Sequence, residues 1–269
     1  MFSLLVLFSN WELSMSKLPQ ENTFLDLSDY GRSPAKIIAK TFKNTSVTPI
    51  HITLIFVVSG LIGILCILNE QYWYAGFFLI LKSILDAADG ELARIKKTPS
   101  YTGRYLDSVS DIILNFLILL TVYHVTNGSL FYMVLAFFGM QLQGTLYNYY
   151  YVILRNKYDG DTTSRVFEID TPIALKGEKQ SHVNILFFCY KFCYGIFDQL
   201  IYVLDKNAEK SENLPNWFMT LVSVFGLGFQ LLLITILLIF DLKEYIIPFF
   251  ILFSIFIFIF IAIRKVLNR

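Results

Sequence analysis

Long apolar stretches are the feature that most constrains this chain. Six of them are each about 20 residues long, the length that an α-helix needs to cross a bilayer. They lie at 50–68, 72–94, 104–124, 129–154, 216–240 and 245–264. Only 16% of the residues are charged, whereas soluble globular proteins have about 25%. We therefore predict an all-α, multi-pass integral membrane protein, a six-transmembrane-helix bundle in contact with membrane lipids. A nucleic-acid partner is not expected.

The N-terminal segment, residues 1–33, is predicted to be polar and cytosolic. Its residues 1–14 are either translated or precede a true start at Met15. We expect the remainder, 34–269, to form one membrane domain.

An amphipathic helix is predicted at the beginning of that domain. Ser33 and Pro34 suit an N-cap and a first helical turn. From Pro34 to Phe42 the apolar and lysine residues fall on different faces, as in a juxtamembrane helix lying on an anionic leaflet. An ordinary solvated helix is the alternative.

A polar region, 156–213, separates the fourth and fifth stretches. It contains the apolar segment 183–204, which is long enough to span a membrane but includes Lys191 and Asp198. A span there would place the C-terminal cations outside the cell. We therefore predict a cytosolic loop followed by an interfacial or re-entrant helix.

Basic residues are distributed unevenly between the two ends of the predicted bundle. The links 69–71, 125–128 and 241–244 contain one Lys and no Arg. The opposite end collects many cations, namely Lys36, Lys40, Lys43, Lys96, Lys97, Arg104, Arg155, Lys157, Arg165, Lys176, Lys179, Arg264, Lys265 and Arg269. By the positive-inside rule, both termini and the 95–103 loop are predicted to be cytosolic.

A charged cluster interrupts the apolar sequence at 84–115. Its carboxylates and cations are Asp86, Asp89, Glu91, Asp107, Asp111, Arg94, Lys96, Lys97 and Arg104. Each Asp, Lys or Arg costs about 2.5–3.5 kcal/mol at the centre of a membrane helix. Charges in such places generally serve a function, so we expect the functional site here.

The spacing of the cluster places its members on two helical stripes. The first stripe has the i, i+3, i+4, i+7 and i+8 residues Asp86, Asp89, Gly90, Ala93 and Arg94. The second has the i, i+4 and i+8 residues Gly103, Asp107 and Asp111. A short turn containing Pro99 makes the two helices antiparallel neighbours, so the stripes can face each other. Four converging carboxylates without His or Cys suit two Mg²⁺ or Mn²⁺ ions.

These residues resemble the signature of the CDP-alcohol phosphotransferase family, D-x-x-D-G-x-x-A-R, eight residues, then G-x-x-x-D-x-x-x-D. The chain fills all eight fixed positions, with Asp86, Asp89, Gly90, Ala93, Arg94, Gly103, Asp107 and Asp111. The six-helix layout with a preceding juxtamembrane helix is also similar, so the resemblance covers most of 34–264. The family transfers a substituted phosphate from a CDP-linked donor, CDP-diacylglycerol or another CDP-alcohol, to an alcohol acceptor and releases CMP.

The resemblance also implies residue roles. Asp86, Asp89 and Asp107 would bind two divalent metals, while Asp111 would help bind the second and act as general base. Arg94 would contact the donor phosphate. The residues implied around the cytidine are Gly90, Ala93, Gly103 and Thr53. Relatives are commonly homodimers, and the same is expected here.

Two positions depart from the pattern of many relatives. The first span often begins T-P-N-x-x-T, but Ile50 occupies the Asn position here. The adjacent His51 either replaces that Asn or is an ordinary interfacial residue. Some relatives also have Lys or Arg after the last Asp, where this chain has Ile112, so the resemblance does not extend to acceptor recognition at that position.

Other readings of the acidic cluster fit less well. An intramembrane prenyltransferase would require two widely separated acidic motifs, and a cation transporter would spread its acids through several helices. Glu91 lies off the acidic stripe and is predicted to be solvated or paired with a lysine at the turn.

Overall fold

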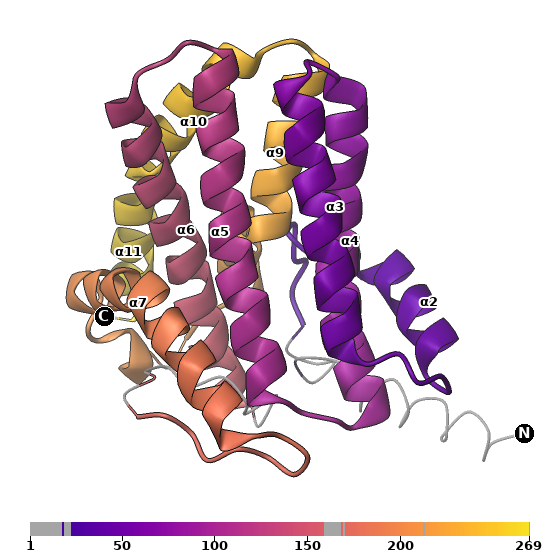
Figure 1. The fold of residues 1–269 in the computed structure, drawn as a ribbon. Coiled ribbons are helices and arrows are strands. Elements are labelled where there is room, and N and C mark those ends of the chain that lie inside the picture. Colours follow the sequence, from indigo (N-terminus) through magenta and orange to yellow (C-terminus); the bar gives the residue numbers. More distant parts are fainter. Residues whose placement is uncertain (1–17, 19–22, 159–167, 169, 212, 269) are drawn as a thin grey trace, which may run out of the picture.

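The computed structural model describes residues 18, 23–158, 168, 170–211 and 213–268, which form helices and loops without any strand. The expectation of an all-α protein is confirmed for this part of the chain. Several long helices run side by side, with short links at one end and the longer polar loops at the other (Figure 1). The segment 1–14 and the proposed start at Met15 lie outside the described residues.

The helices take up most of the described chain. In order they are α2 (Arg32–Phe42), α3 (Pro49–Leu68), α4 (Tyr72–Lys96), α5 (Tyr101–Val125), α6 (Leu130–Lys157), α7 (Gln180–Leu204), α8 (Asn216–Val222), α9 (Leu227–Ile239), α10 (Ile246–Phe253) and α11 (Ile255–Leu267). Short 3-10 helices are η2 (Ala208–Lys210), η3 (Ser223–Phe225) and η4 (Lys243–Tyr245).

Five helical segments of the described chain are long and apolar enough to cross a membrane, and there are six if a bent pair of helices forms one span. The five are α3, α5, α6, α7 and the run Lys243–Leu267. The bent pair is Asn216–Phe225 with Leu227–Ile239, whose two parts meet at 53°. These segments support a multi-pass membrane protein, although the set differs from the predicted six at two helices.

Helices α4 and α7 account for that difference. Although α4 was predicted to be the second span, its charged second half removes it from the set by composition. It nevertheless packs lengthwise between α3 and α9. Conversely, α7 qualifies by length and apolarity, whereas we predicted an interfacial or re-entrant helix. Figure 1 shows α7 crossing one end of the bundle obliquely, against α5 and α6.

Helix α2 begins earlier than predicted. Its N-cap is Gly31 rather than Ser33, because the Arg32 amide already donates to the Asp29 carbonyl in a preceding turn. The buried residues of α2 are Ala35 and Ala39, which pack toward α4, and Ile37 on another face is exposed.

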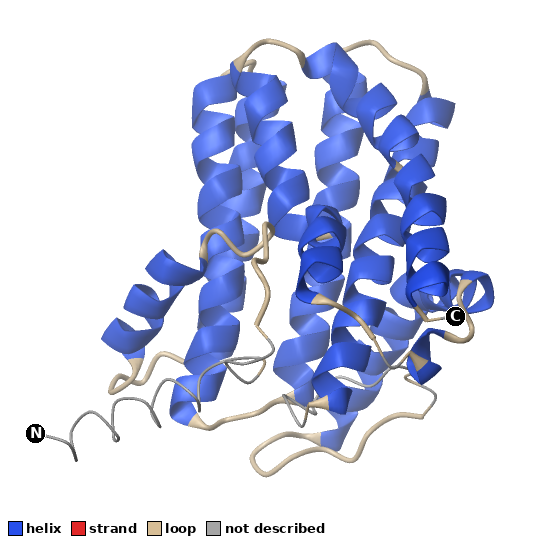
Figure 2. Cartoon of the chain, turned by 180° about the vertical axis from the view of Figure 1, so that it is seen from behind, coloured by secondary structure: helices blue, strands red, loops and turns tan. Residues whose placement is uncertain are grey.

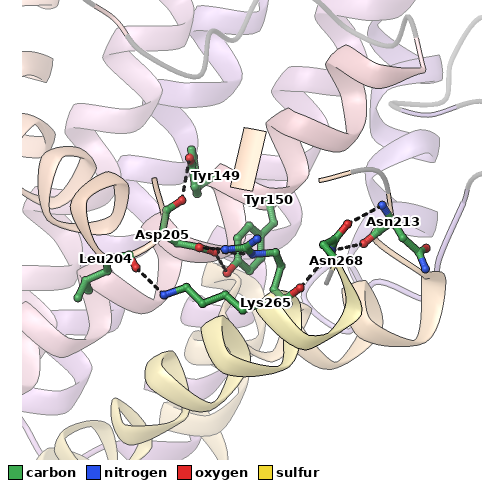
Figure 3. A network of polar contacts seen from close by, with 8 residues as sticks. Tyr149, Tyr150, Leu204, Asp205, Asn213, Lys265 and Asn268 are labelled. Atoms are coloured by element: carbon green, nitrogen blue, oxygen red, sulfur yellow. Dashed lines mark hydrogen bonds and ion pairs between the residues drawn. The ribbon is translucent and has the colours of Figure 1, made fainter. Parts of the chain in front are cut away.

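A buried network anchors the C-terminal helix to the end of α7 (Figure 3). The Asp205 carboxylate accepts hydrogen bonds from Arg264 Nε at 2.9 Å, from a second Arg264 nitrogen, and from the Tyr150 hydroxyl at 2.6 Å. The sequence placed Arg264 among the charges at the membrane surface. Here it is only 4% exposed, because Asp205 compensates its charge.

Candidate active site

The α4–α5 hairpin brings the two acidic stripes together. Lys97 ends α4 in the left-handed conformation, with φ 54°. Ser100 then caps α5, because its hydroxyl accepts the Gly103 amide at 2.8 Å. The turn between the caps is therefore short and reverses the direction of the chain, as the sequence predicted. The two helices nevertheless make little backbone contact with each other, and α3 packs against both, whereas we predicted direct neighbours.

Three of the predicted acidic residues meet at one point. Carboxylate oxygens of Asp86, Asp89 and Asp107 all lie within 4.8 Å of one another. Asp107 Oδ1 is buried and has no hydrogen-bond partner among the described residues. Like charges at this separation destabilise one another unless something compensates them. Clustered carboxylate oxygens fit a hard divalent cation such as Mg²⁺ or Mn²⁺, so the residues present suit that ion.

The fourth acidic residue, Asp111, lies outside this group of three and has a different partner. It forms an ion pair with Lys82, whose side chain is fully buried. Lys82 Nζ also lies 3.9 Å from Asp86 Oδ2 and 4.9 Å from the centre of the Phe56 ring. Lys82 therefore links the group of three to Asp111.

Lys82 was not among the site residues predicted from the sequence. A signal was available, because Lys82 is a cation within an apolar stretch and lies one helical turn before Asp86. Its partner Asp111 is 29 residues away, so the pairing itself could not be read from local spacing.

Helix α3 contributes Thr53 to the site. The Thr53 hydroxyl donates to Asp89 Oδ2 at 2.6 Å. Its neighbour His51 has a local role instead, since His51 Nδ1 accepts the Thr48 amide at 3.0 Å and closes a capping box at the start of α3. The structure thus favours the reading of His51 as an ordinary residue at the helix end.

Arg94 and the small residues lie beside the carboxylates on the same stripe. Arg94 pairs with Glu91 at 2.9 Å. The prediction that Glu91 is solvated or paired with a lysine was wrong, because Glu91 is 1% exposed and Arg94 is its partner. A Cβ on Gly90 would first meet the Arg94 guanidinium, at 3.6 Å. Ala93 is half-buried.

Gly103 completes the predicted set, at the first turn of α5. A Cβ there would meet the Ser100 hydroxyl at 3.2 Å and Ile50 Cγ1 at 3.7 Å. Gly103 thus lies between the cap of α5 and the first turn of α3. The eight motif residues and Thr53 consequently occupy three consecutive helices of the bundle.

Segments that follow α6 close over the beginning of α5. Glu168 accepts hydrogen bonds from Arg104 at 2.5 Å and from the Tyr105 hydroxyl at 3.0 Å. Glu178 accepts from the Thr102 amide at 2.7 Å and from the Ser100 hydroxyl at 2.8 Å. Burial alone would raise the pKa of Glu178, but these hydrogen bonds outweigh it and leave the pKa below its ordinary value.

Comparison with known protein families gives a match within the chain. The sequence profile of a family described as CDP-alcohol phosphatidyltransferase matches residues 46–175. This range contains α3 to α6, all eight motif residues and Thr53. No curated protein matches the chain.

Proposed function

The chain belongs to the CDP-alcohol phosphatidyltransferase family through residues 46–175, and from this premise we propose the reaction that it catalyses. It transfers a substituted phosphate group from a CDP-linked donor to the hydroxyl of an alcohol acceptor and releases CMP. The observation that carries the proposal is the meeting of Asp86, Asp89 and Asp107 within 4.8 Å, inside the matched range. This is a phosphodiester-forming step, as phospholipid biosynthesis requires.

Divalent metal is part of this proposal. Asp86, Asp89 and Asp107 would hold Mg²⁺ or Mn²⁺, and Asp111 would contribute to a second ion. Such ions neutralise the charge of the donor pyrophosphate and the charge that develops during transfer. Thr53, which donates to Asp89, holds that carboxylate in position.

The remaining residues bind donor and acceptor. Arg94 presents its guanidinium next to Gly90, and a planar guanidinium binds phosphate oxygens well. Gly90, Ala93 and Gly103 leave room for the cytidine. Asp111, oriented by Lys82, takes the proton from the acceptor hydroxyl as general base.

The membrane setting follows from the same proposal. The turn between α4 and α5 lies at the end of the bundle that also carries the polar loops (Figure 1). Lys96 and Lys97 precede this turn, and their charge supports a cytosolic active site by the positive-inside rule. The active form is expected to be a homodimer.

The test is a matrix of CDP donors against alcohol acceptors. Purified protein in detergent with Mg²⁺ or Mn²⁺ is given CDP-diacylglycerol or a CDP-linked headgroup, together with polyols, amino alcohols or diacylglycerol, and CMP is measured. We expect release from at least one pair, and none from Asp86→Asn. If the wild-type protein releases no CMP from any pair, the proposal is refuted.

A further inference from the structure

Residues 23–31, here called the inserted segment, lie within the bundle. Figure 1 shows them as an indigo trace beside α4, and Figure 2 shows the same loop from behind. The Tyr147 hydroxyl of α6 donates to Asp26 at 2.5 Å, and the Leu27 amide donates to the Ser223 hydroxyl at 2.9 Å. The predicted cytosolic segment thus extends between α6, η3 and α4.

Two glycines make room for the inserted segment. A Cβ on Gly228 would lie 1.9 Å from the Ser28 carbonyl oxygen, and one on Gly226 would lie 2.3 Å from the Ser28 side chain. Real Cβ atoms do not approach other atoms so closely, so any larger residue would displace Ser28. Gly226 also lies at the 53° bend between η3 and α9. The bend and the absence of side chains at Gly226 and Gly228 leave a space that Ser28 occupies, here called the notch.

Tyr30 is the residue of the inserted segment that lies next to the acidic site. Its hydroxyl is buried and makes no hydrogen bond of normal geometry with the described residues. It lies near the Ser83 hydroxyl and interacts electrostatically with Lys82 and Asp86. An unsatisfied buried hydroxyl is costly and is therefore rare without a purpose. A ligand group bound at this point would satisfy it.

The position of Tyr30 separates it from the donor side of the site. Along α4, its neighbours Lys82 and Ser83 precede Asp86, whereas Gly90 and Arg94 follow it. Lys82 in turn pairs with Asp111, the proposed base. The inserted segment also lies outside residues 46–175, which match the family. Tyr30 thus lies on the side of the site where Asp111, the proposed general base, is held by Lys82. It also belongs to a part of the chain that the family profile does not cover.

We infer that the inserted segment forms the acceptor side of the site and that the Tyr30 hydroxyl donates a hydrogen bond to the acceptor alcohol. This inference rests on the proposed function. In the acceptor alcohol, Tyr30 would bind an oxygen atom close to the hydroxyl that reacts. An acceptor substrate that bears several hydroxyl or other polar groups therefore fits this side of the site better than one with an apolar chain.

The first test is Tyr30→Phe, which removes only the hydroxyl. With an active donor and acceptor pair, we expect the KM for the acceptor to rise about tenfold, the effect of one hydrogen bond. The KM for the donor, Mn²⁺ binding and the thermal midpoint should be unchanged, although a merely structural role would move the midpoint. Tyr74→Phe is the matched control, because Tyr74 is largely exposed.

The second test is Gly228→Ala, whose added methyl group would displace the Ser28 backbone and retain the Tyr30 hydroxyl itself. It should raise the acceptor KM while leaving donor binding intact, and Gly195→Ala, where the nearest atom lies 3.7 Å from the added Cβ, should change neither. An unchanged acceptor KM in Tyr30→Phe, or an equal rise for donor and acceptor, overturns the inference. A wild-type protein without CMP release refutes the proposed function itself, and this inference with it.

Discussion

Two buried charged clusters in this protein differ in how well their charges are matched. At the end of α7, the Asp205 carboxylate has Arg264 and Tyr150 as partners, and both of its oxygens accept hydrogen bonds (Figure 3). At the α4–α5 hairpin, three carboxylates crowd together and Asp107 Oδ1 lacks a partner among the described residues. A matched cluster holds the fold together, whereas an unmatched one is compensated by what it binds. The following predictions test that contrast.

The largest effect is expected at Asp111. Asp111→Asn removes the proposed base, so turnover should fall by about 10²–10⁴-fold, while donor binding is retained. The fully buried Lys82 then loses its closest partner, so the thermal midpoint should also fall. The double variant Lys82→Met/Asp111→Asn should recover the midpoint but not the turnover. Recovery of both, or a fully active single variant, would contradict the assignment of the base.

The matched cluster should respond in stability alone. Arg264→Met leaves Asp205 buried without its cation, which costs about 3–5 kcal/mol, measured by thermal unfolding in detergent. Lys265→Met is the control, because exposed Lys265 only reaches the Leu204 carbonyl, at 3.3 Å. The fraction of Arg264→Met protein that is folded should release CMP at the wild-type rate. Equal midpoints for the two variants would show that the network adds no stability.

A smaller effect is expected at Thr53. Thr53→Val removes the hydrogen bond to Asp89, and bonds to charged groups contribute about 1.5–3 kcal/mol. We expect Mn²⁺ affinity to fall by about tenfold or more, as measured by calorimetry. The control is Thr121→Val, a buried threonine whose hydroxyl donates to the Leu117 carbonyl of its own helix. A similar loss of Mn²⁺ affinity in both variants would contradict a role for Thr53 in positioning Asp89.

The smallest effect concerns the cap of α5. The lowered pKa of Glu178 means that its ionised form stabilises the fold above the ordinary value of 4.5. That contribution is lost as the pH falls through the lower pKa of the folded state. The protection of the Thr102 amide, which is its exchange rate relative to the intrinsic rate at the same pH, should therefore fall as the pH drops below 4.5. In Glu178→Gln the Thr102 amide should be weakly protected already at neutral pH, and the same pH profile of protection as in the wild type would contradict the role of Glu178.

The local part of the site could be predicted from the sequence. The residues Asp86, Asp89 and Asp107 occupy two stripes of consecutive helices, and a short turn reverses the chain between those helices. The helical periodicity and the turn therefore predicted that they meet, and the structure confirms that they do.

Long-range contacts were beyond sequence reasoning. Thr53 reaches Asp89 across 36 residues, and Arg264 reaches Asp205 across 59. Neither partner is indicated by periodicity, because such pairs depend on how the helices pack. The inserted segment was missed for the same reason, since its polar residues resemble a solvated terminus until the notch at Gly226 and Gly228 is known.

Calorimetric titration of the purified protein with Mn²⁺ tests the central claim most directly. We predict that the wild-type protein binds the ion, and that Asp107→Asn binds it at least about tenfold more weakly while its thermal midpoint without metal is no lower. Binding of equal affinity in both proteins, or no ion uptake by the wild type, would contradict the account of the acidic cluster as a metal site.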